Sequence, residues 1–367
     1  MERSNIAVGL IGVGNCASSL VQGLNHYTDG ANDLVGLGHW DLGGYRPSDI
    51  RIASAWDIDR RKVGRDVAEA IFAPPNCTAR FCDAVRPTGA VVQMAPVLDG
   101  YPAHMAEMPV DRRFEPAEAP EPSPDDVIRQ LHGTGTEMLV NYLPVGSQRA
   151  TEFFAECALK AGVAFVNAMP VFIASNAAWA RRFAEAGVPV IGDDIKAQLG
   201  ATIVHRVLTD LFARRGVSLD RTYQLNTGGN TDFLNMLNRT RLTSKKISKT
   251  EAVQSVAARR LEAGNIHIGP SDYVAWQNDN KVCFLRMEGR LFGGVPMNLE
   301  MRLSVEDSPN SAGVAIDMIR CARIALDRGL SGAIEAPAAI YCKHPPRQMT
   351  DDRAAEALDA FVKEVVH

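Results

Sequence analysis

The chain has 367 residues, of which 46% are hydrophobic and 22% are charged, and its formal net charge is −4. This length suits two domains, no apolar run approaches the roughly 18 residues of a membrane-spanning helix, and the charge provides no general basic surface for nucleic acid. The seven cysteines contain no CxxC pair, which argues against a disulfide framework or a zinc cluster. Residues 1–5 leave no room for a signal peptide. We therefore expect a cytoplasmic protein that acts on small molecules.

The first two hundred residues alternate between strand-like and helix-like patterns. An apolar run at 6–11 leads into the glycine-rich sequence GVGNCA and then a helical pattern that continues to about Tyr27. Further apolar runs occur at 50–56, 90–94, 138–142, 164–166 and 188–191, and helical patterns at 150–161 and 176–186. This alternation predicts βα units over a parallel sheet, an α/β fold of the Rossmann type.

One segment, 96–124, interrupts this alternation. It is rich in proline and acidic residues, which disfavour regular secondary structure. We expect a surface loop there and assign it no function.

The pattern changes after a long helical run at 201–215. Strands are predicted at 221–225, 282–286 and 297–305, the last with clear period-two alternation. A strong helical pattern at 312–326 then returns the chain to the first domain. We expect an inserted α+β domain at 200–309, and a Rossmann-like domain built from 1–199 and 310–367.

The sequence GVGNCA follows the GxGxxA pattern between a strand and a helix. In dinucleotide-binding proteins, the glycines of this pattern let the backbone approach a pyrophosphate at the helix N-terminus. Gly12 and Gly14 are the corresponding residues here. Asp57, which ends the second strand, is the expected carboxylate for the adenosine ribose and favours NAD over NADP. Asp66 is a weaker second candidate, more typical of a helix surface. The alternative is a tight turn in a protein that binds no nucleotide.

Lysine is scarce, with nine residues against thirty arginines, and five of the nine lie between residues 245 and 343. An arginine cannot replace an ammonium group that must be compact or exchange a proton. The five lysines are Lys245, Lys246, Lys249, Lys281 and Lys343. By contrast, Lys62, Lys160 and Lys363 occur in patterns typical of exposed helix faces, and we assign them no role.

Spacing adds information for two of these lysines. Lys245 and Lys249 would share one helix face, which is unfavourable unless an anion lies between them; the alternative is a solvated basic turn. Lys281 lies where a hairpin enters a strand, a position that favours a surface role, and Lys343 is ambiguous.

Polar residues also cluster after predicted strands. Asp193 and Asp194 follow the run at 188–191, at the edge where open α/β sheets bind ligands; either could instead cap a helix. The glycine-rich loop with Asn230 and Asp232 could bind sugar hydroxyls or a nicotinamide amide, although it could be an ordinary turn. Histidines show no metal-ligand spacing, and His205 is interpreted as structural.

Taken in order, several motifs resemble one family. They are GVGNCASS, LVNYLPVGS, AFVNAMPVF, GDDIKAQ, LNTGGNTDFLNM, SKKISK, DNK and EDSPNSAGV, followed by Lys343. Together they resemble the myo-inositol-1-phosphate synthase (inositol-3-phosphate synthase) family in its shorter actinobacterial form, over nearly the whole chain.

This resemblance implies the first step of inositol biosynthesis, in which D-glucose 6-phosphate becomes 1D-myo-inositol 3-phosphate. NAD would be reduced and reoxidised within one turnover, through oxidation, enolisation, intramolecular aldol closure and reduction. The resemblance also implies a cytoplasmic homotetramer whose domain at 200–309 serves catalysis and oligomerisation.

The resemblance further implies individual roles. Lys245 and Lys343 would act at O5, Lys281 at O1 and Lys249 at the phosphate, while Asp194 would orient Lys245. The implied cofactor-binding residues are Gly12, Gly14, Asn15, Cys16, Asp57, Asp66, Ala197, Asp232, Lys245 and Asp307. The implied substrate-binding residues are Asn230, Asp232, Lys249, Lys281 and Lys343. A mono- or divalent cation would lie near Asp279 and Asp307.

The chain departs from longer eukaryotic relatives at 197–200 and at 344–346. After Lys196, it lacks their hydroxyl-rich sequence, so we expect backbone groups to contact the phosphate there. Two other functions stay open on the residues themselves: a conventional NAD-dependent sugar-phosphate dehydrogenase and a non-catalytic NAD-sensing protein.

Overall fold

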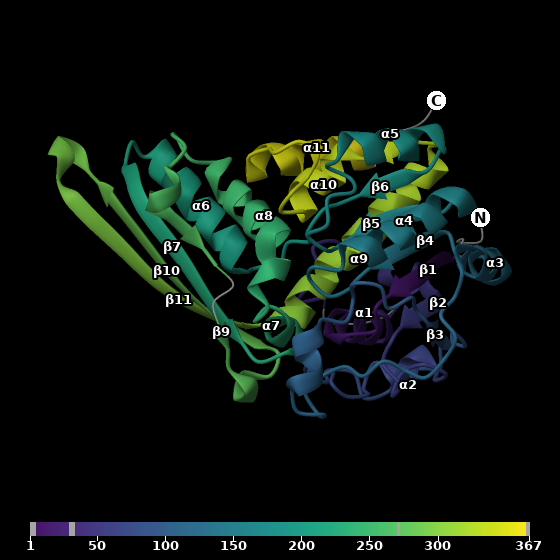
Figure 1. Ribbon diagram of the computed structural model, residues 1–367. Coiled ribbons are helices and arrows are strands. Elements are labelled where there is room, and N and C mark those ends of the chain that lie inside the picture. The colour runs from purple at the N-terminus through teal and green to yellow at the C-terminus, as the bar shows by residue number, and fades with distance from the viewer. Residues whose placement is uncertain (1–4, 29–33, 270–271, 365–367) are drawn as a thin grey trace.

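The computed structural model describes residues 5–28, 34–269 and 272–364 and arranges them around two β-sheets (Figure 1). The larger sheet has seven parallel strands in the spatial order β12-β6-β5-β4-β1-β2-β3. They are β1 (Ile6–Ile11), β2 (Ile50–Asp57), β3 (Val92–Met94), β4 (Met138–Asn141), β5 (Ala164–Asn167), β6 (Pro189–Ile191) and β12 (Gly332–Ala333). The six strands predicted from apolar runs are confirmed, as is the Rossmann-like fold class.

Helices cover both faces of this sheet, which explains why β1 is buried along its whole length and reads as a continuous apolar run. Helices α1 and α9 contribute to the core on one face, and α3, α4 and α5 to the core on the other. The helices around the sheet are α1 (Asn15–His26), α2 (Val67–Ala70), α3 (Pro124–Thr134), α4 (Gln148–Ala161), α5 (Ala177–Glu185), α9 (Asp307–Asp327), α10 (Glu335–Tyr341) and α11 (Asp351–Lys363).

The strand order reverses at β1, which pairs with β2 on one side and β4 on the other. In open α/β sheets, ligands bind beyond the carboxyl ends of the strands at such a reversal. The glycine turn follows β1 directly, so the topology places it at the expected ligand-binding edge.

The smaller sheet contains β11, β10, β7 and β8 in that order, with β9 also pairing with β7. Strand β10 runs antiparallel to both of its neighbours. The strands are β7 (Ser218–Gly228), β8 (Ile266–Ile268), β9 (Asp272–Tyr273), β10 (Asn280–Arg290) and β11 (Pro296–Glu306), and the associated helices are α6 (Ala201–Arg214), α7 (Thr231–Asn235) and α8 (Thr243–Gln254). Figure 1 shows α9 passing from the end of β11 back into the larger sheet. The predicted strands are confirmed, although each is longer than its pattern indicated.

The proline-rich segment 96–124 is largely irregular, as predicted, with one short 3₁₀ turn at Ala103–Glu107. It is not isolated on the surface, because Met105 and Phe114 pack against Leu234 of α7. His104 also contacts the carbonyl oxygen of Leu234. The segment therefore joins the two sheet regions beside the ligand-binding edge.

Within the described ranges, no helix has the length and apolar character needed to cross a membrane. His205 is buried in α6, where its Nε2 lies 2.9 Å from Thr222 Oγ1. Burial lowers its pKa to about 4, so a neutral, structural histidine agrees with the prediction.

Candidate active site

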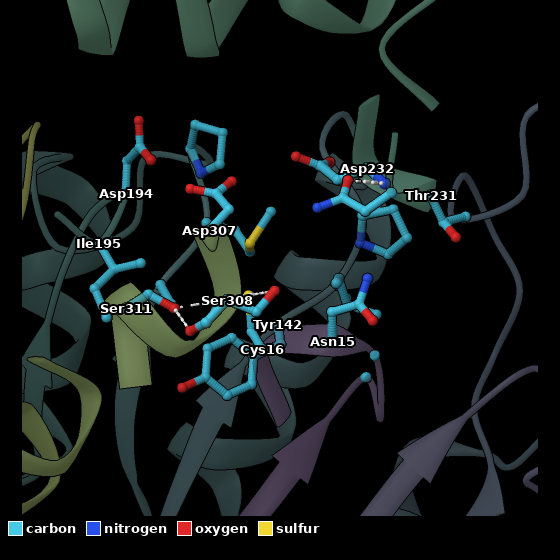
Figure 2. Close-up of a pocket in the computed structure, with 18 of the residues that line it drawn as sticks. Asn15, Cys16, Tyr142, Asp194, Ile195, Thr231, Asp232, Asp307, Ser308 and Ser311 are labelled. Carbon is cyan, nitrogen blue, oxygen red and sulfur yellow. Dashed lines mark hydrogen bonds between the residues drawn. The ribbon is translucent and has the colours of Figure 1, made fainter. Parts of the chain in front are cut away.

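A large pocket lies between the two sheet regions and spans about 1660 Å³ together with its open mouth. Most predicted site residues line it: Gly12, Gly14, Asn15, Cys16, Asp57, Asp194, Ala197, Asn230, Asp232, Lys245, Lys249, Lys281, Asp307 and Lys343. Figure 2 shows Asp194, Asp232 and Asp307 around an open space next to Cys16 and Tyr142.

The glycine turn forms one wall of the pocket. Gly12 has a φ of +91°, and a Cβ there would lie 2.8 Å from the carbonyl oxygen of Tyr142. Gly14 is the N-cap of α1, supplies no side-chain cap, and has open space where a Cβ would stand. The first amides of α1 are thus free to meet an anionic group such as a pyrophosphate.

Asp57 lies at the end of β2 beneath this turn. Its Oδ2 accepts a 2.7 Å hydrogen bond from Val13 N and its Oδ1 accepts one of 2.8 Å from Asp59 N. Each carboxylate oxygen keeps a further lone pair. Asp57 can therefore accept hydrogen bonds from ribose hydroxyls while it holds the turn.

Asp66 lies outside the pocket, contrary to its predicted role at the ribose. Its carboxylate caps α2 through Ala68 N and also accepts hydrogen bonds from Thr88 N and Gly89 N. Backbone amides of a distant loop therefore use the acceptors that a ribose would need. The sequence around Asp66 indicates a carboxylate, but it does not indicate that residues 88–89 lie against that carboxylate in the fold.

The prediction that Lys62 lies on an exposed helix face is wrong. Its side chain lines the pocket, and Nζ donates to Val13 O at 2.8 Å and to Asn76 Oδ1 at 2.9 Å. The same ammonium group lies 4.0 Å from Asp57. Lys62 thus fixes the backbone of the glycine turn and balances the charge of Asp57. Lys160 and Lys363 are exposed, as predicted.

Replacing Lys62 with methionine is expected to raise the Kd for NAD about tenfold, because two hydrogen bonds to the turn and its neighbour are lost. Titration calorimetry would measure the change, with the exposed Lys160→Met as a matched control. A Lys62→Met protein that binds NAD as tightly as the control would contradict this role.

Besides Lys62, four lysines from three parts of the chain line the pocket: Lys245 and Lys249 from α8, Lys281 from β10, and Lys343 from the link between α10 and α11. Three of them have carboxylate partners. Lys245 Nζ lies 2.9 Å from Asp232 Oδ2, Lys281 Nζ 2.8 Å from Asp307 Oδ1, and Lys343 Nζ 2.8 Å from Asp194 Oδ1. Lys245 and Lys249 lie four residues apart in α8, so the prediction that they share a helix face is confirmed. Lys281 lines the pocket, so the interpretation that favoured a surface role for it is wrong.

Lys249 differs from the other three. It is only 5% exposed, and within the described part of the chain its ammonium group has no hydrogen-bond or ion-pair partner. Burial, together with the charges of Lys245 and Lys281, lowers its pKa well below the ordinary value. A buried cation in such surroundings is stabilised when an anion binds beside it.

The ion pair between Lys281 and Asp307 keeps both of its members charged despite burial. Burial opposes ionisation of Asp307, yet the charge of Lys281 lowers the pKa of this carboxyl below its ordinary value. The same pair raises the pKa of Lys281 against the effect of burial. Lys281 is therefore held as an ammonium group that can donate a proton or a hydrogen bond.

Asp194 is placed differently from the prediction, which made it the partner of Lys245. It accepts hydrogen bonds from Lys343 Nζ at 2.8 Å and from Ser248 Oγ at 2.6 Å, whereas Asp232 is the partner of Lys245. Burial would raise the pKa of Asp194, but the charges of Lys343 and Lys245 lower it overall. Asp194 consequently orients Lys343 and ties it to α8.

The neighbouring Asp193 points away from the pocket. It accepts hydrogen bonds from Ile173 N, Ser175 N and Asn167 Nδ2, and burial raises its pKa to about 6. Asp193 thus organises the loop after β5. Neither aspartate caps a helix, because β6 is followed by irregular chain until α6.

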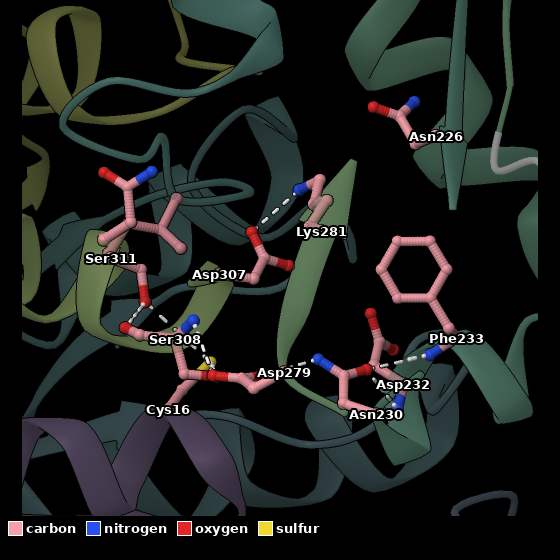
Figure 3. Close-up of polar contacts among 12 residues, drawn as sticks. Cys16, Asn226, Asn230, Asp232, Phe233, Asp279, Lys281, Asp307, Ser308 and Ser311 are labelled. Carbon is pink, nitrogen blue, oxygen red and sulfur yellow. Dashed lines mark hydrogen bonds and ion pairs between the residues drawn. The ribbon is translucent and has the colours of Figure 1, made fainter. Parts of the chain in front are cut away.

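A second polar chain runs beneath the pocket (Figure 3). Asn230 caps α7 and donates to Asp279 Oδ1 at 2.9 Å, and Asp279 also accepts hydrogen bonds from Ser308 N and Ser308 Oγ. Burial raises the pKa of Asp279 to about 6. Asp279 thus joins the loop after β7 to the start of α9.

Within residues 5–28, 34–269 and 272–364, no three His, Cys, Asp or Glu side chains come together as a metal site. Asp279 uses its oxygens for Asn230 and Ser308, and Asp307 uses one for Lys281. The expected cation near these two carboxylates stays a prediction.

Several pocket residues were missed from the sequence. Tyr142, Ser308 and Ser311 line the pocket, and among the described residues the buried hydroxyl of Tyr142 has no hydrogen-bond partner. All three occur in the motifs LVNYLPVGS and EDSPNSAGV, which could have indicated them. Ala197 and Gly200 also line the pocket, in keeping with backbone contacts where the hydroxyl-rich sequence is absent.

Comparisons with known proteins agree over almost the whole chain. A family model described as "Myo-inositol-1-phosphate synthase" matches residues 200–308. The chain is 52% identical over 368 residues to the inositol-3-phosphate synthase of Mycolicibacterium smegmatis, covering 99% of both proteins. It is 51% identical over 361 residues to that of Mycobacterium tuberculosis, covering 98% of this chain and 96% of the relative. Among solved structures, that of Ari2 is similar with a TM-score of 0.79 and 33% identity over 98% of each chain.

Proposed function

Since the chain belongs to the inositol-3-phosphate synthase family, we propose that its pocket converts D-glucose 6-phosphate to 1D-myo-inositol 3-phosphate with an NAD that is reduced and reoxidised within one turnover. The chain is thus an enzyme of inositol biosynthesis. The observation that carries the proposal is that Lys245, Lys281 and Lys343, each paired with a carboxylate, lie in one pocket with Lys249, which has no such partner among the described residues.

The glycine-turn half of the pocket fits NAD. The uncapped N-terminus of α1 suits the pyrophosphate of NAD, and Asp57 suits its adenosine ribose. The hydroxyl of Tyr142, which has no partner among the described residues, offers a hydrogen bond to the rest of the cofactor. A carboxylate at the ribose repels a 2′-phosphate, which favours NAD over NADP. When bound, NAD supplies the acceptor for the C5 hydride and returns that hydride after ring closure.

The lysines suit the charge that develops on the sugar. In the first step the C5 hydroxyl loses a proton, and we place Lys245 and Lys343 at O5, where a neutral amine accepts this proton. The resulting ammonium group then donates to the C5 carbonyl oxygen and stabilises the enolate formed when C6 passes its proton to an oxygen of the substrate phosphate. Asp194 supports this step, because it holds Lys343 through a 2.8 Å contact.

Ring closure moves negative charge from the enolate to the C1 aldehyde oxygen. C6 forms a bond to C1, and the aldehyde oxygen becomes an oxyanion that must receive a proton. We place Lys281 at O1, because its pairing with Asp307 keeps it charged and fixed. Lys249 is placed at the phosphate, an anion that can pair directly with its ammonium group.

The test is the product formed with NAD at a small fraction of the substrate concentration. Purified enzyme and glucose 6-phosphate should yield inositol phosphate well in excess of the NAD present, with no lasting NADH absorbance. NADH that accumulates in step with substrate would instead identify a sugar-phosphate dehydrogenase. NAD binding without any turnover would identify a non-catalytic NAD sensor.

We also propose that 200–309 serves oligomerisation as well as catalysis, in a homotetramer. One face of the smaller sheet supports this, since Tyr223, Leu225 and Phe284 are apolar, exposed and on the same side of β7 and β10. Light scattering of the pure protein should give four times the chain mass, and a stable monomer would contradict the proposal.

A further inference from the structure

Arg206 is a fully buried arginine that does not line the pocket. It lies in α6, four residues after Thr202, a pocket residue. Burial of a charged side chain is costly unless fixed partners surround it. The partners of Arg206 belong to the two chain segments that carry Lys245, Lys249 and Lys343.

The first set of partners lies at the end of α8. Arg206 Nη1 donates to the carbonyl oxygen of Ala252, in the last turn of this helix, and to Ser255 Oγ at 3.1 Å. Carbonyls in a last helical turn lack helical partners, and a cation there interacts favourably with the helix dipole. The guanidinium thus anchors the C-terminal end of the helix that carries Lys245 and Lys249.

The second set lies in the C-terminal segment. Arg206 Nη2 donates to Met349 O at 2.8 Å and lies 3.2 Å from Asp351 Oδ1, at the start of α11. Gln348 extends this contact, because its Oε1 lies 3.5 Å from Arg206 Nη1 and its Nε2 donates to Lys343 O at 2.8 Å. Arg206 is therefore one side chain away from the backbone of Lys343.

We propose that Arg206 is a positioning residue that holds α8 and the 343–351 segment in register, so that Lys245, Lys249 and Lys343 meet in one pocket. The inference rests on the proposed function of these lysines. An arginine is required because its planar fork carries five donors and reaches both segments at once, whereas an ammonium group cannot span them.

Two substitutions test this role. Arg206→Lys keeps the positive charge but removes the planar guanidinium group, and Gln348→Met removes the hydrogen bond to the carbonyl oxygen of Lys343. A displacement of about 1 Å in a reacting group can cost roughly 10²-fold in rate. We expect Arg206→Lys to lower kcat about 10²-fold and Gln348→Met about tenfold. KM for glucose 6-phosphate and Kd for NAD should change by less than about threefold, because neither residue lines the pocket.

Arg320 provides a matched control. It is also fully buried, and it donates to the carbonyl oxygens of Trp40, Tyr45 and His39 beside Asp317, none of which lines the pocket. Arg320→Lys should lower the melting temperature as Arg206→Lys does, while its kcat stays within about threefold of wild type when measured below both melting temperatures.

Two results would overturn the inference: unchanged kcat in both Arg206→Lys and Gln348→Met, or an equal fall in kcat in Arg320→Lys. Should Arg206→Lys fail to fold, Gln348→Met decides, since its side chain is only partly buried. Failure of the proposed function is distinguishable, because the wild-type protein would then form no inositol phosphate.

Discussion

Replacing Lys281 with methionine is expected to lower kcat for inositol phosphate formation about 10³-fold, the scale of losing one donor to a developing oxyanion. Lys281 is paired with Asp307 at 2.8 Å, so the substitution also leaves a partly buried carboxylate without its cation. The remaining negative charge would further disfavour the oxyanion at O1. Quantifying the product over time, with saturating substrate and NAD, measures the effect.

The matched control is Lys246→Met, which removes an exposed ammonium group from α8. It should leave kcat within about threefold of wild type. NAD binding should persist in both variants, which separates loss of chemistry from loss of the cofactor. A Lys281→Met enzyme that retains more than about one tenth of the wild-type kcat would rule out an essential donor at this position.

Replacing Lys249 with methionine is expected to raise KM for glucose 6-phosphate about 10²-fold. A hydrogen bond to a charged partner contributes up to about 3 kcal/mol, and each 1.4 kcal/mol is a factor of ten. The same substitution is expected to stabilise the ligand-free protein by about 1 kcal/mol, because it removes a buried ammonium group with no partner among the described residues. Steady-state kinetics and thermal unfolding measure the two effects.

The stability gain should depend on pH in a defined direction. Burial lowers the pKa of Lys249 in the folded protein, so between that pKa and the ordinary value of about 10.4 the unfolded chain binds more protons. Wild-type stability therefore improves as pH rises through this window, and the advantage of Lys249→Met shrinks. Melting temperatures from neutral to alkaline pH test this, and a variant less stable than wild type throughout would contradict a buried, unpartnered cation.

The larger sheet and the lysines could be predicted because their signals are local. Each buried strand is a short apolar run, and β1 leads directly into the glycine turn. Lysine scarcity pointed to Lys245, Lys246, Lys249, Lys281 and Lys343, the family motifs gave a role to each of these except Lys246, and the structure brings the other four together. The two-residue strand β12 was missed because so short a segment carries no periodicity.

Partner choice could not be predicted, because it depends on contacts between distant segments. Lys62 has the pattern of a surface residue, yet it binds Val13, 49 positions away. Asp194 pairs with Lys343, which lies 149 positions away in the chain. Neither motif indicates that Asp194 pairs with Lys343 instead of Lys245. The burial of Arg206 could not be predicted either, because an arginine in an amphipathic helix ordinarily faces solvent.

The central claim is that the C5 hydride leaves the sugar and returns to the same sugar within this lysine-lined pocket. The most direct test uses glucose 6-phosphate carrying deuterium at C5, with unlabelled NAD at a small fraction of its concentration. The account predicts inositol phosphate that retains the deuterium, formed through many turnovers without lasting NADH. Deuterium that accumulates in free NADH, in proportion to an oxidised sugar phosphate, would contradict it.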